Sequence, residues 1–551
     1  MPLHGILSLT ERRVLEAKHE CLQRQALAIR KEMNTGNTAA VLPEHILVTI
    51  FQLYAAAPCL PDIHGWLAIS WVCSRWRTIA LLAAVLWTQI PVTELAVVGS
   101  YLSRSKTLPL YITGKLCNVP KEKVGNKIQR DQSLRSITTW SSVLTHAARI
   151  EGLTIDHDFR LKQGRLCASG LRYAKFPKLR CLSIQGRNID ELHPVKDCEQ
   201  LPALLRGLDQ MQQLEEVATK CIPLPLVTNL FSPSLKKLDI GILAYATPAA
   251  AWTLPWDTFW SKLGQLSSLQ QLSLATFPPL PASGTAHLPP TPLTLPALTK
   301  LTLSWRDTDR ALEAAHFLAH TALPARCALH VAQTGGTGTV RAFEALCAAV
   351  ARARAAPAAP LRTLRIARVT EHAVQLACWT AALSVAALVV RPGAPRAPEP
   401  APLLKVAVHS SCSAAQLGGL LRMLPLQSVT NVALCDASGG FLSPGMPAHG
   451  VRALLVSEQA AHEAIRGLGG GGCVPVPMPA LEALHLVDLY VGEDGRGWAG
   501  ELRTSLQRRS KQLPDAPRLR LVVDDPKLHD TRKWMYIVEP VVESVGYVMR
   551  L

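Results

Sequence analysis

The sequence predicts an α/β repeat fold in which a short all-α segment at the N-terminus is followed by a long, irregular solenoid. Three observations support this prediction: an apolar pattern recurs from about residue 140 onward, helical stretches separate its copies, and residues 42–90 carry apolar side chains at helical spacing. With 551 residues, 48% of them hydrophobic, the chain is long enough to bury a large core.

The recurring pattern is apolar-x-x-apolar-x-apolar, which resembles the strand signature of leucine-rich repeats. The clearest copies begin at Leu179, Leu235, Leu269, Leu298 and Leu481. Weaker copies begin at Ile150, Leu361, Val385, Leu403, Val429 and Val451. Four of the five clear copies have a proline two residues before the first leucine, namely Pro177, Pro233, Pro296 and Pro479.

One strand and one helix cannot bury their own apolar faces, so successive units are expected to stack. We therefore expect residues 140–551 to form a leucine-rich-repeat-like solenoid. Pro-rich runs at 278–297 and 391–402 and a Gly-rich run at 467–472 are expected to be loop insertions.

Residues 1–40 are expected to contain one amphipathic helix. Ser8 and Glu11 have the spacing of a capping box, which predicts a helix from about 9 to 33. On this helix Leu15, Leu22 and Ile29 recur every seven residues and form a narrow apolar seam. The seam fits either a short coiled coil with a partner or a helix packed on its own chain.

Residues 42–90 show two further helical patterns. After Pro43, the side chains of Ile46, Ile50 and Leu53 form one line along a predicted helix, with Leu47, Phe51 and Tyr54 beside it. The next predicted helix places Ile69, Val72, Cys73, Trp76 and Ile79 on one face. A unit of under about 50 residues with this much apolar surface is poorly stabilised alone, so we expect it to bury part of that surface on something else.

The order of these residues resembles the F-box. The resemblance rests on the start Leu42-Pro43-Glu44, the pair Ile50-Phe51, the core Val72-Cys73-x-x-Trp76-Arg77 and the late pair Leu86-Trp87. It is most similar to the F-box-like proteins of mushroom-forming fungi and covers residues 41–95. In that family the F-box docks on a Skp-type adaptor protein, and through it on a cullin, while the C-terminal region holds a substrate protein for ubiquitination.

The resemblance implies two sets of residues. Those expected to bind the adaptor are Leu42, Pro43, Ile46, Leu47, Ile50, Phe51, Leu67 and Trp87. Those expected to form the F-box core are Ile69, Val72, Cys73, Trp76 and Ile79. It also implies a non-enzymatic protein with no catalytic residues, no cofactor and no metal site. The substrate is not identified, and the alternative is a repeat-based interaction scaffold that is not linked to degradation.

The charge and the cysteines bear on partners and compartment. The formal net charge is +17, and between Arg104 and Arg135 eight basic residues face only two acidic ones. We interpret residues 96–139 as a basic linker or a first irregular unit and do not expect nucleic-acid binding, because few aromatic side chains are there for base stacking. The 14 scattered cysteines contain no CxxC pair. This usage is typical of reduced thiols and indicates a cytoplasmic or nuclear protein.

Three other patterns have plain structural interpretations. Ala373–Val390 is almost uncharged over 18 residues, the lower limit for a membrane span, and we interpret it as a buried helix running into a buried strand, with no membrane partner. The glycine-rich string at 467–472 lacks the context of a phosphate-binding loop, and the string at 334–339, although it lies between a predicted strand and a predicted helix, lacks the Lys and Ser/Thr of a P-loop. His316 and His320 are four residues apart, but no third metal ligand is in view.

Overall fold

The computed structural model describes most of the chain in detail. The described residues are 9–35, 42–56, 65–116, 118–119, 127–157, 165–166, 171, 174–186, 213–241, 254–280, 292–305, 310–333, 340–353, 360–370, 373–383, 401–409, 414–435, 450–457, 461, 465, 468, 478–487, 496–524 and 537–547. The chain divides into two compact units. Unit 1 comprises Met1–Arg187 with Val195–Met211, and unit 2 comprises Asn188–Pro194 with Gln212–Leu551.

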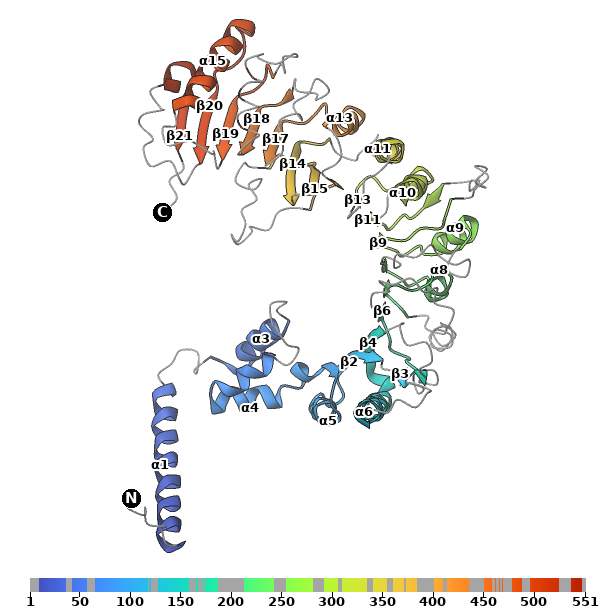
Figure 1. Cartoon of the computed structure of the whole chain (residues 1–551), viewed down its shortest axis with the longest axis vertical. Coiled ribbons are helices and arrows are strands. Elements are labelled where there is room, and N and C mark those ends of the chain that lie inside the picture. The colour runs from blue at the N-terminus through green and yellow to red at the C-terminus, as the bar shows by residue number, and fades with distance from the viewer. Residues whose placement is uncertain are drawn as a thin grey trace. The chain divides into compact units, whose positions relative to one another are not determined.

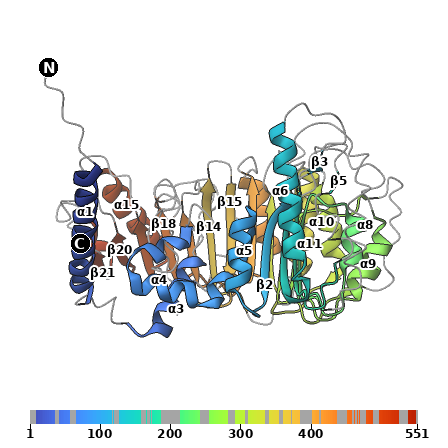
Figure 2. The ribbon, with the colours of Figure 1, turned by 90° about the horizontal axis from the view of Figure 1, so that it is seen from below.

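Unit 1 begins with helices and continues into a sheet (Figure 1). The helices before the first strand are α1 (Leu9–Thr35), α3 (Glu44–Ala55), η1 (Gly65–Trp71), α4 (Ser74–Leu82) and η2 (Ala84–Trp87). The elements that follow are β1 (Gln89–Val92), α5 (Leu95–Arg104), β2 (Leu110–Leu116), β3 (Asn118–Val119), α6 (Lys127–Leu144), η3 (Ala147–Arg149), β4 (Ile150–His157), β5 (Arg165–Leu166) and β6 (Cys181–Gly186). Strands β1, β2, β4 and β6 pair in parallel in that order. Helices α5 and α6 contact each other, as Figure 2 shows, and both also contact β1.

Unit 2 alternates strands with helices. Its first half contains β7 (Glu216–Lys220), α8 (Leu224–Val227), η5 (Thr228–Leu230), β8 (Lys237–Ile240), α9 (Trp256–Gly264), β9 (Gln271–Leu274), β10 (Leu293–Thr294), β11 (Lys300–Trp305), α10 (Arg310–Ala319), β12 (Thr321–Ala322), β13 (Ala328–Gln333) and α11 (Val340–Ala353). Its second half contains β14 (Thr363–Thr370), β15 (Ala373–Trp379), β16 (Leu404–His409), α13 (Ala414–Met423), β17 (Asn431–Cys435), β18 (Ala453–Ser457), β19 (Ala483–Val487), α15 (Arg496–Gln512), β20 (Arg520–Asp524), η9 (Glu539–Val541) and β21 (Ser544–Tyr547). Its helices lie along one face of its strands (Figure 1).

The predicted fold class is wrong. The long strands belong to one 17-stranded, mostly parallel sheet, so the chain is a large mixed α/β protein and not an all-α segment followed by a solenoid. The N-terminal helices lead straight into this sheet, because β1 follows η2 after a single residue and pairs with β2. The apolar pattern reports which side chains of a strand are buried, whereas strand pairing depends on backbone hydrogen bonds that the pattern does not encode.

A reversal of strand direction interrupts the parallel pairing in unit 2. Strand β15 pairs antiparallel with β14 on one side and with β16 on the other. Strand β16 then pairs in parallel with β13, and β14 pairs in parallel with β17. The spatial order is therefore β13, β16, β15, β14, β17.

The interpretation of Ala373–Val390 as a helix running into a strand is corrected by this hairpin. Residues Ala373–Trp379 form β15, an extended strand that advances roughly 3.2–3.4 Å per residue. Because β15 lies between its neighbours β14 and β16, the uncharged run is explained by burial inside the sheet. Residues 384–390, with the repeat copy at Val385, lie outside the described residues. Among the described residues, no helix is both long and apolar enough to cross a membrane.

The recurring prolines have a local structural reason. The amide of the first leucine of each clear copy donates to the carbonyl three residues earlier, as Leu235 does to Ser232 at 2.9 Å and Leu298 does to Leu295 at 3.1 Å. This closes a β-turn before the strand. The prolines at 177, 233, 296 and 479 occupy the second position of four such turns, where the fixed φ of proline is favourable.

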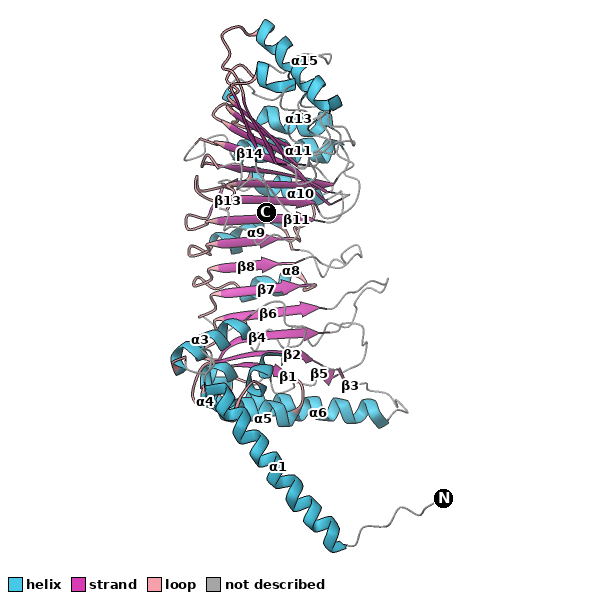
Figure 3. Ribbon diagram, turned by 90° about the vertical axis from the view of Figure 1, so that its left-hand side faces the viewer, coloured by secondary structure: helices cyan, strands magenta, loops and turns pink. Residues whose placement is uncertain are grey.

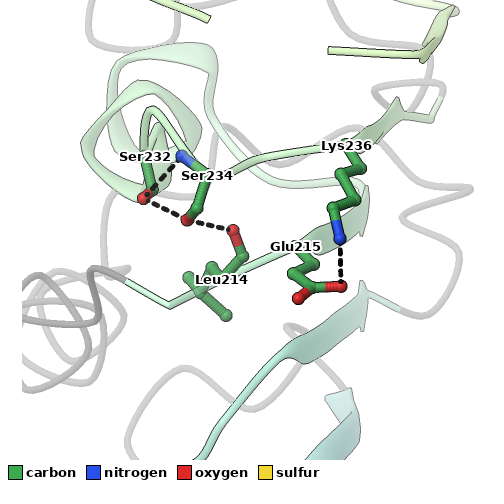
Figure 4. Close-up of polar contacts among 5 residues, drawn as sticks. All are labelled: Leu214, Glu215, Ser232, Ser234 and Lys236. Carbon is green, nitrogen blue, oxygen red and sulfur yellow. Dashed lines mark hydrogen bonds and ion pairs between the residues drawn. The ribbon is translucent and has the colours of Figure 1, made fainter. Parts of the chain in front are cut away.

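The turns stack because the backbone amides at the start of one strand donate to the carbonyl of the residue just before the previous strand. Lys236 and Lys237 both donate their amides to the Glu215 carbonyl, at 2.7 and 2.9 Å, and the same arrangement recurs from strand to strand. Figure 4 shows the polar side chains around this step: Ser234 Oγ donates to the Leu214 carbonyl at 2.9 Å, and Lys236 pairs with Glu215 at 3.1 Å. The neighbouring strands consequently lie side by side in the same direction (Figure 3).

Burial along the strands changes within unit 2. Strands β8, β9 and β11 alternate exposed or half-buried residues with buried ones, as expected when helices cover one face of a sheet. Strands β17 and β18 are instead buried at four consecutive positions. Their second face contributes to an apolar cluster made of Ala367, Ala377, Trp379, Leu383, Ala433, Cys435, Leu455 and Val487. The sheet therefore has one covered face near β8 and two near β17.

Candidate protein-binding surface

The inner side of helix α3 holds the helical part of unit 1 together. Leu47 and Phe51, one turn apart on α3, are completely buried. The ring of Phe51 lies 5.1 Å from the ring of Trp76 on α4, in the tilted arrangement that aromatic pairs favour. These contacts fix α3 against α4 and turn the opposite side of α3 outward.

The start of α3 is tied to α4 by polar contacts. Arg75 donates to the carbonyl of Leu42 at 2.6 Å. The Pro43 carbonyl accepts the first helical amides, those of Ile46 and Leu47, at 3.1 Å each. Because proline has no amide of its own to satisfy, it is well suited to this position.

A second aromatic cluster, made of Trp66, Trp87 and Tyr101, joins η1 and η2 to helix α5. The rings of Trp66 and Trp87 are 5.1 Å apart, and Tyr101 of α5 lies 4.9 Å from Trp87. Trp66 donates to the Tyr101 hydroxyl at 3.2 Å, Trp87 donates to the Ala80 carbonyl at 2.9 Å, and the Arg104 guanidinium lies 4.3 Å above the Trp87 ring. Arg104, at the start of the basic stretch, therefore has a structural contact.

The outer side of α3 carries a row of exposed apolar side chains. They are Ile46, Ile50, Leu53 and Tyr54, all at helical spacing on one face, and Leu53 is 70% exposed. We call these four residues the α3 row. Single exposed apolar residues are ordinary, but a continuous row of them on one helix is typical of an interaction site.

Two further apolar side chains are exposed next to this helix. Trp71 ends η1 and is 77% exposed, and Val72 is 58% exposed. Helix η1 contacts both α3 and α4. A tryptophan at this exposure contributes a large apolar area, and tryptophan is enriched among residues that dominate binding energy in protein interfaces.

The residues predicted to bind an adaptor fall into three groups. The exposed ones are Pro43, Ile46 and Ile50; the half-buried ones are Leu42 and Leu67; and the fully buried ones are Leu47, Phe51 and Trp87. The structure thus places the last three inside unit 1. Leu47 and Phe51 are four residues apart on α3, as Ile46 and Ile50 are, and only the packing of α4 and η2 separates the two sides.

Of the five predicted core residues, two are buried, two are half-buried and one is exposed. Ile69 and Ile79 are buried, and Cys73 and Trp76 are half-buried. Val72 is at the surface, because the chain does not form one α-helix from 66 to 79: a 3-10 helix ends at Trp71, and α4 begins at Ser74 with Cys73 as its N-cap. A 3-10 helix has three residues per turn, so the face inferred from 3.6 residues per turn is shifted.

The residues expected to bind the adaptor or to form the core did not include several residues of this region. Leu53, Tyr54 and Trp71 belong to the exposed surface, and Trp66 and Tyr101 belong to the second aromatic cluster. The apolar line through Ile46, Ile50 and Leu53 was a usable signal for the first of these. Nothing in the linear pattern connects Tyr101 with Trp66, 35 residues earlier.

His316 on α10 and His320, the residue that follows this helix, show a structural role. The rings of His316 and His320 are 4.4 Å apart, and His316 also packs edge-on against Trp256 at 4.9 Å. Burial, together with the neighbouring His320, lowers the pKa of His316 to about 4. Within the described ranges, no group of three His, Cys, Asp or Glu side chains is arranged to hold a metal ion.

Comparison with known proteins adds no family assignment. No family model matches the chain, and no curated protein matches it. The function therefore has to be argued from the residues themselves. The α3 row with Trp71 and Val72 contains no Asp, Glu, Lys, Arg or His side chain, so its chemistry is suited to burying apolar area against another protein.

Proposed function

We propose that the chain is a substrate-recruiting component of a Skp/cullin/F-box ubiquitin ligase. In this proposal the α3 row docks on a Skp-type adaptor protein, and unit 2 holds a substrate protein. The observation that carries it is the exposure of Ile46 and Ile50 on a helix that begins at Leu42-Pro43-Glu44, the start of the sequence that resembles the F-box. The protein itself needs no catalytic residue in this role.

The physical argument rests on the area that the helix leaves open. Burial of apolar surface contributes roughly 25 cal/mol per Å², so a row of four large exposed side chains is a substantial source of binding energy. A few central side chains usually supply most of it, while their neighbours exclude water. Ile50 lies in the middle of the row and is the best candidate for such a central residue.

The first experiment compares two charge substitutions on the same helix. Ile50→Asp places an unpaired carboxylate in the proposed interface and should abolish co-purification of the Skp-type adaptor with the full chain. Gln52→Asp introduces the same charge at an exposed position outside the α3 row and should leave co-purification unchanged. Equal recovery of the adaptor with Ile50→Asp and the unsubstituted chain would refute the proposed interface.

The second experiment tests the link to ubiquitination. The full chain and Ile50→Asp are affinity-purified from cells with and without a proteasome inhibitor. A substrate of the ligase should bind both forms and accumulate with inhibitor, and its ubiquitinated species should appear only with the unsubstituted chain. Proteins that bind both forms, with no effect of inhibitor and no ubiquitination, would instead identify an interaction scaffold without a role in degradation.

A further inference from the structure

Helix α1 is long and leaves its apolar seam open. It spans 27 residues, and each of its described side chains from Thr10 to Met33 is exposed. Most helices in proteins are stabilised by packing of an apolar face, and propensity alone stabilises them only weakly. Of the two interpretations of the seam, packing on the helix's own chain is therefore not supported by these side chains.

The seam has the positions of a coiled coil. Leu15, Leu22 and Ile29 occupy d positions, and Ala26 and Met33 occupy a positions of the same heptads. Two other large apolar residues, Val14 and Leu27, lie at the outer c and b positions. The helix thus offers a seam of about three heptads, with residues outside it that serve as internal controls.

The charges beside the seam distinguish between the orientations of two identical helices. In a parallel pair, the g and e positions would bring Glu11 of each copy against Glu16 of the other, which is repulsive. In an antiparallel pair with Leu22 packed beside Ala26 of the second copy, Glu16 faces Arg30 and Lys18 faces Glu32. Both contacts are attractive, and the two-fold axis repeats each of them. The described flanking charges contain no like-charge contact in this register.

We propose that α1 is a dimerisation helix that pairs with α1 of a second copy in an antiparallel coiled coil. Leu22 beside Ala26 forms the central layers, Leu15 meets Met33 at the ends, and His19 packs against Ile29. The second copy is the proposed occupant because its flanking charges complement those of this chain in one orientation and repel in the other. This inference does not depend on the proposed role in ubiquitination.

The apolar seam is tested by a matched pair of substitutions in the full chain. Leu22 and Leu27 are 56% and 62% exposed on the same helix, so both tolerate a polar side chain in the isolated chain equally well. Sedimentation across a concentration series should show a dimer for the unsubstituted protein and for Leu27→Asp. Leu22→Asp should raise the dissociation constant at least about tenfold, since it buries two unpaired carboxylates in the central layers. A monomer at every concentration, or equal dimerisation of both variants, overturns the proposal.

The charge pairing is tested by a swap. Glu16→Arg should weaken the dimer, because each substituted side chain then faces Arg30 of the second copy. Adding Arg30→Glu should restore dimerisation, since the pair is present again with reversed sign. Both forms lose the contact between Arg12 and Glu16 within the helix, at 3.1 Å, so that loss cannot explain a difference between them. No recovery in the double variant overturns the assigned register.

The orientation is tested by disulfide formation. With Cys21, which is exposed on the outer side of α1, replaced by serine, Gln23→Cys should form a disulfide-linked dimer, because the two copies of position 23 face each other across the axis. Leu27→Cys should not do so. Arg12→Cys should also remain unlinked in the antiparallel pair. A disulfide at position 12 in place of 23 would show that the helices are parallel.

Discussion

The ring of Phe51 packs 5.1 Å from the ring of Trp76 and thereby joins helix α3 to helix α4. This contact separates two kinds of apolar residue on α3. Phe51 and Leu47 stabilise the fold, whereas Ile46, Ile50, Leu53 and Tyr54 remain at the surface. Substitutions on the inner side are therefore expected to lower stability, and substitutions on the outer side are expected to weaken binding.

Phe51→Ala should destabilise the helical segment by about 3–5 kcal/mol, because it leaves a cavity in a fully buried site and removes the contact with Trp76. Leu53→Ala, on the exposed side of the same helix, should change stability by less than about 0.5 kcal/mol. Chemical unfolding followed by tryptophan fluorescence measures both. A small effect of Phe51→Ala would mean that α3 is not held against α4 by this ring.

Two glycines of unit 1 should respond in opposite directions to alanine. A Cβ at Gly114 would lie 2.6 Å from the Trp140 ring and 2.7 Å from the Val92 side chain, so Gly114→Ala should cost about 1–3 kcal/mol through overpacking. A Cβ at Gly99, within α5, meets nothing within 4 Å. Gly99→Ala should stabilise the protein by about 0.5–1 kcal/mol, since alanine favours the helix. Melting temperatures of the two variants should shift in opposite directions.

Arg509 should be a structural residue of unit 2. It is buried on α15 and donates to the carbonyls of Met478 and Leu481 at 3.1 and 3.2 Å, and to that of Pro517 at 3.2 Å. It thus attaches the helix to the proline-containing turn before β19. Arg509→Ala should cost about 3 kcal/mol, because it removes charged donors and leaves these carbonyls without their partner. Arg508→Ala, its exposed neighbour, should be nearly neutral, and urea unfolding distinguishes the two.

The sequence located the strands better than their arrangement. In the triads that begin at Leu235, Leu269 and Leu298, the first leucine ends the turn before β8, β9 or β11 and the other two apolar residues lie on the strand. All are buried, and the strand members are two residues apart because a strand with one covered face has a period of two. Neither the single 17-stranded sheet nor the reversal at β15 could be predicted, since backbone pairing leaves little trace in side-chain patterns.

The candidate surface was predictable to a similar degree. The apolar line along α3 was evident, but the side that packs inward depends on contacts with residues far along the chain, such as Trp76 with Phe51. Val72 was misplaced because a short 3-10 helix cannot be distinguished from an α-helix by apolar spacing alone. Tyr101 was missed because its contacts with Trp66 and Trp87 are made through the fold.

The final prediction concerns acid sensitivity of unit 2. Burial and the neighbouring His320 lower the pKa of His316 to about 4, and burial with the nearby Lys300 and Lys405 lowers that of His330 to about 4. The unfolded chain has histidine pKa values near 6.5, so between pH 6.5 and 4 it binds more protons than the folded chain. The stability contributed by the neutral rings is therefore complete above pH 6.5 and is lost progressively as the pH falls toward 4.

His316→Phe tests this linkage while keeping the ring contact with Trp256. Phenylalanine does not titrate, so the melting temperature of this variant should fall less between pH 7 and pH 4.5 than that of the unsubstituted protein. His320→Phe, one turn further along the chain and just past the end of α10, is the matched control. Because burial lowers the pKa of His316 more than His320 does, most of the acid sensitivity should remain. Parallel melting curves for His316→Phe and the unsubstituted protein across this range would show that protonation of His316 does not limit acid stability.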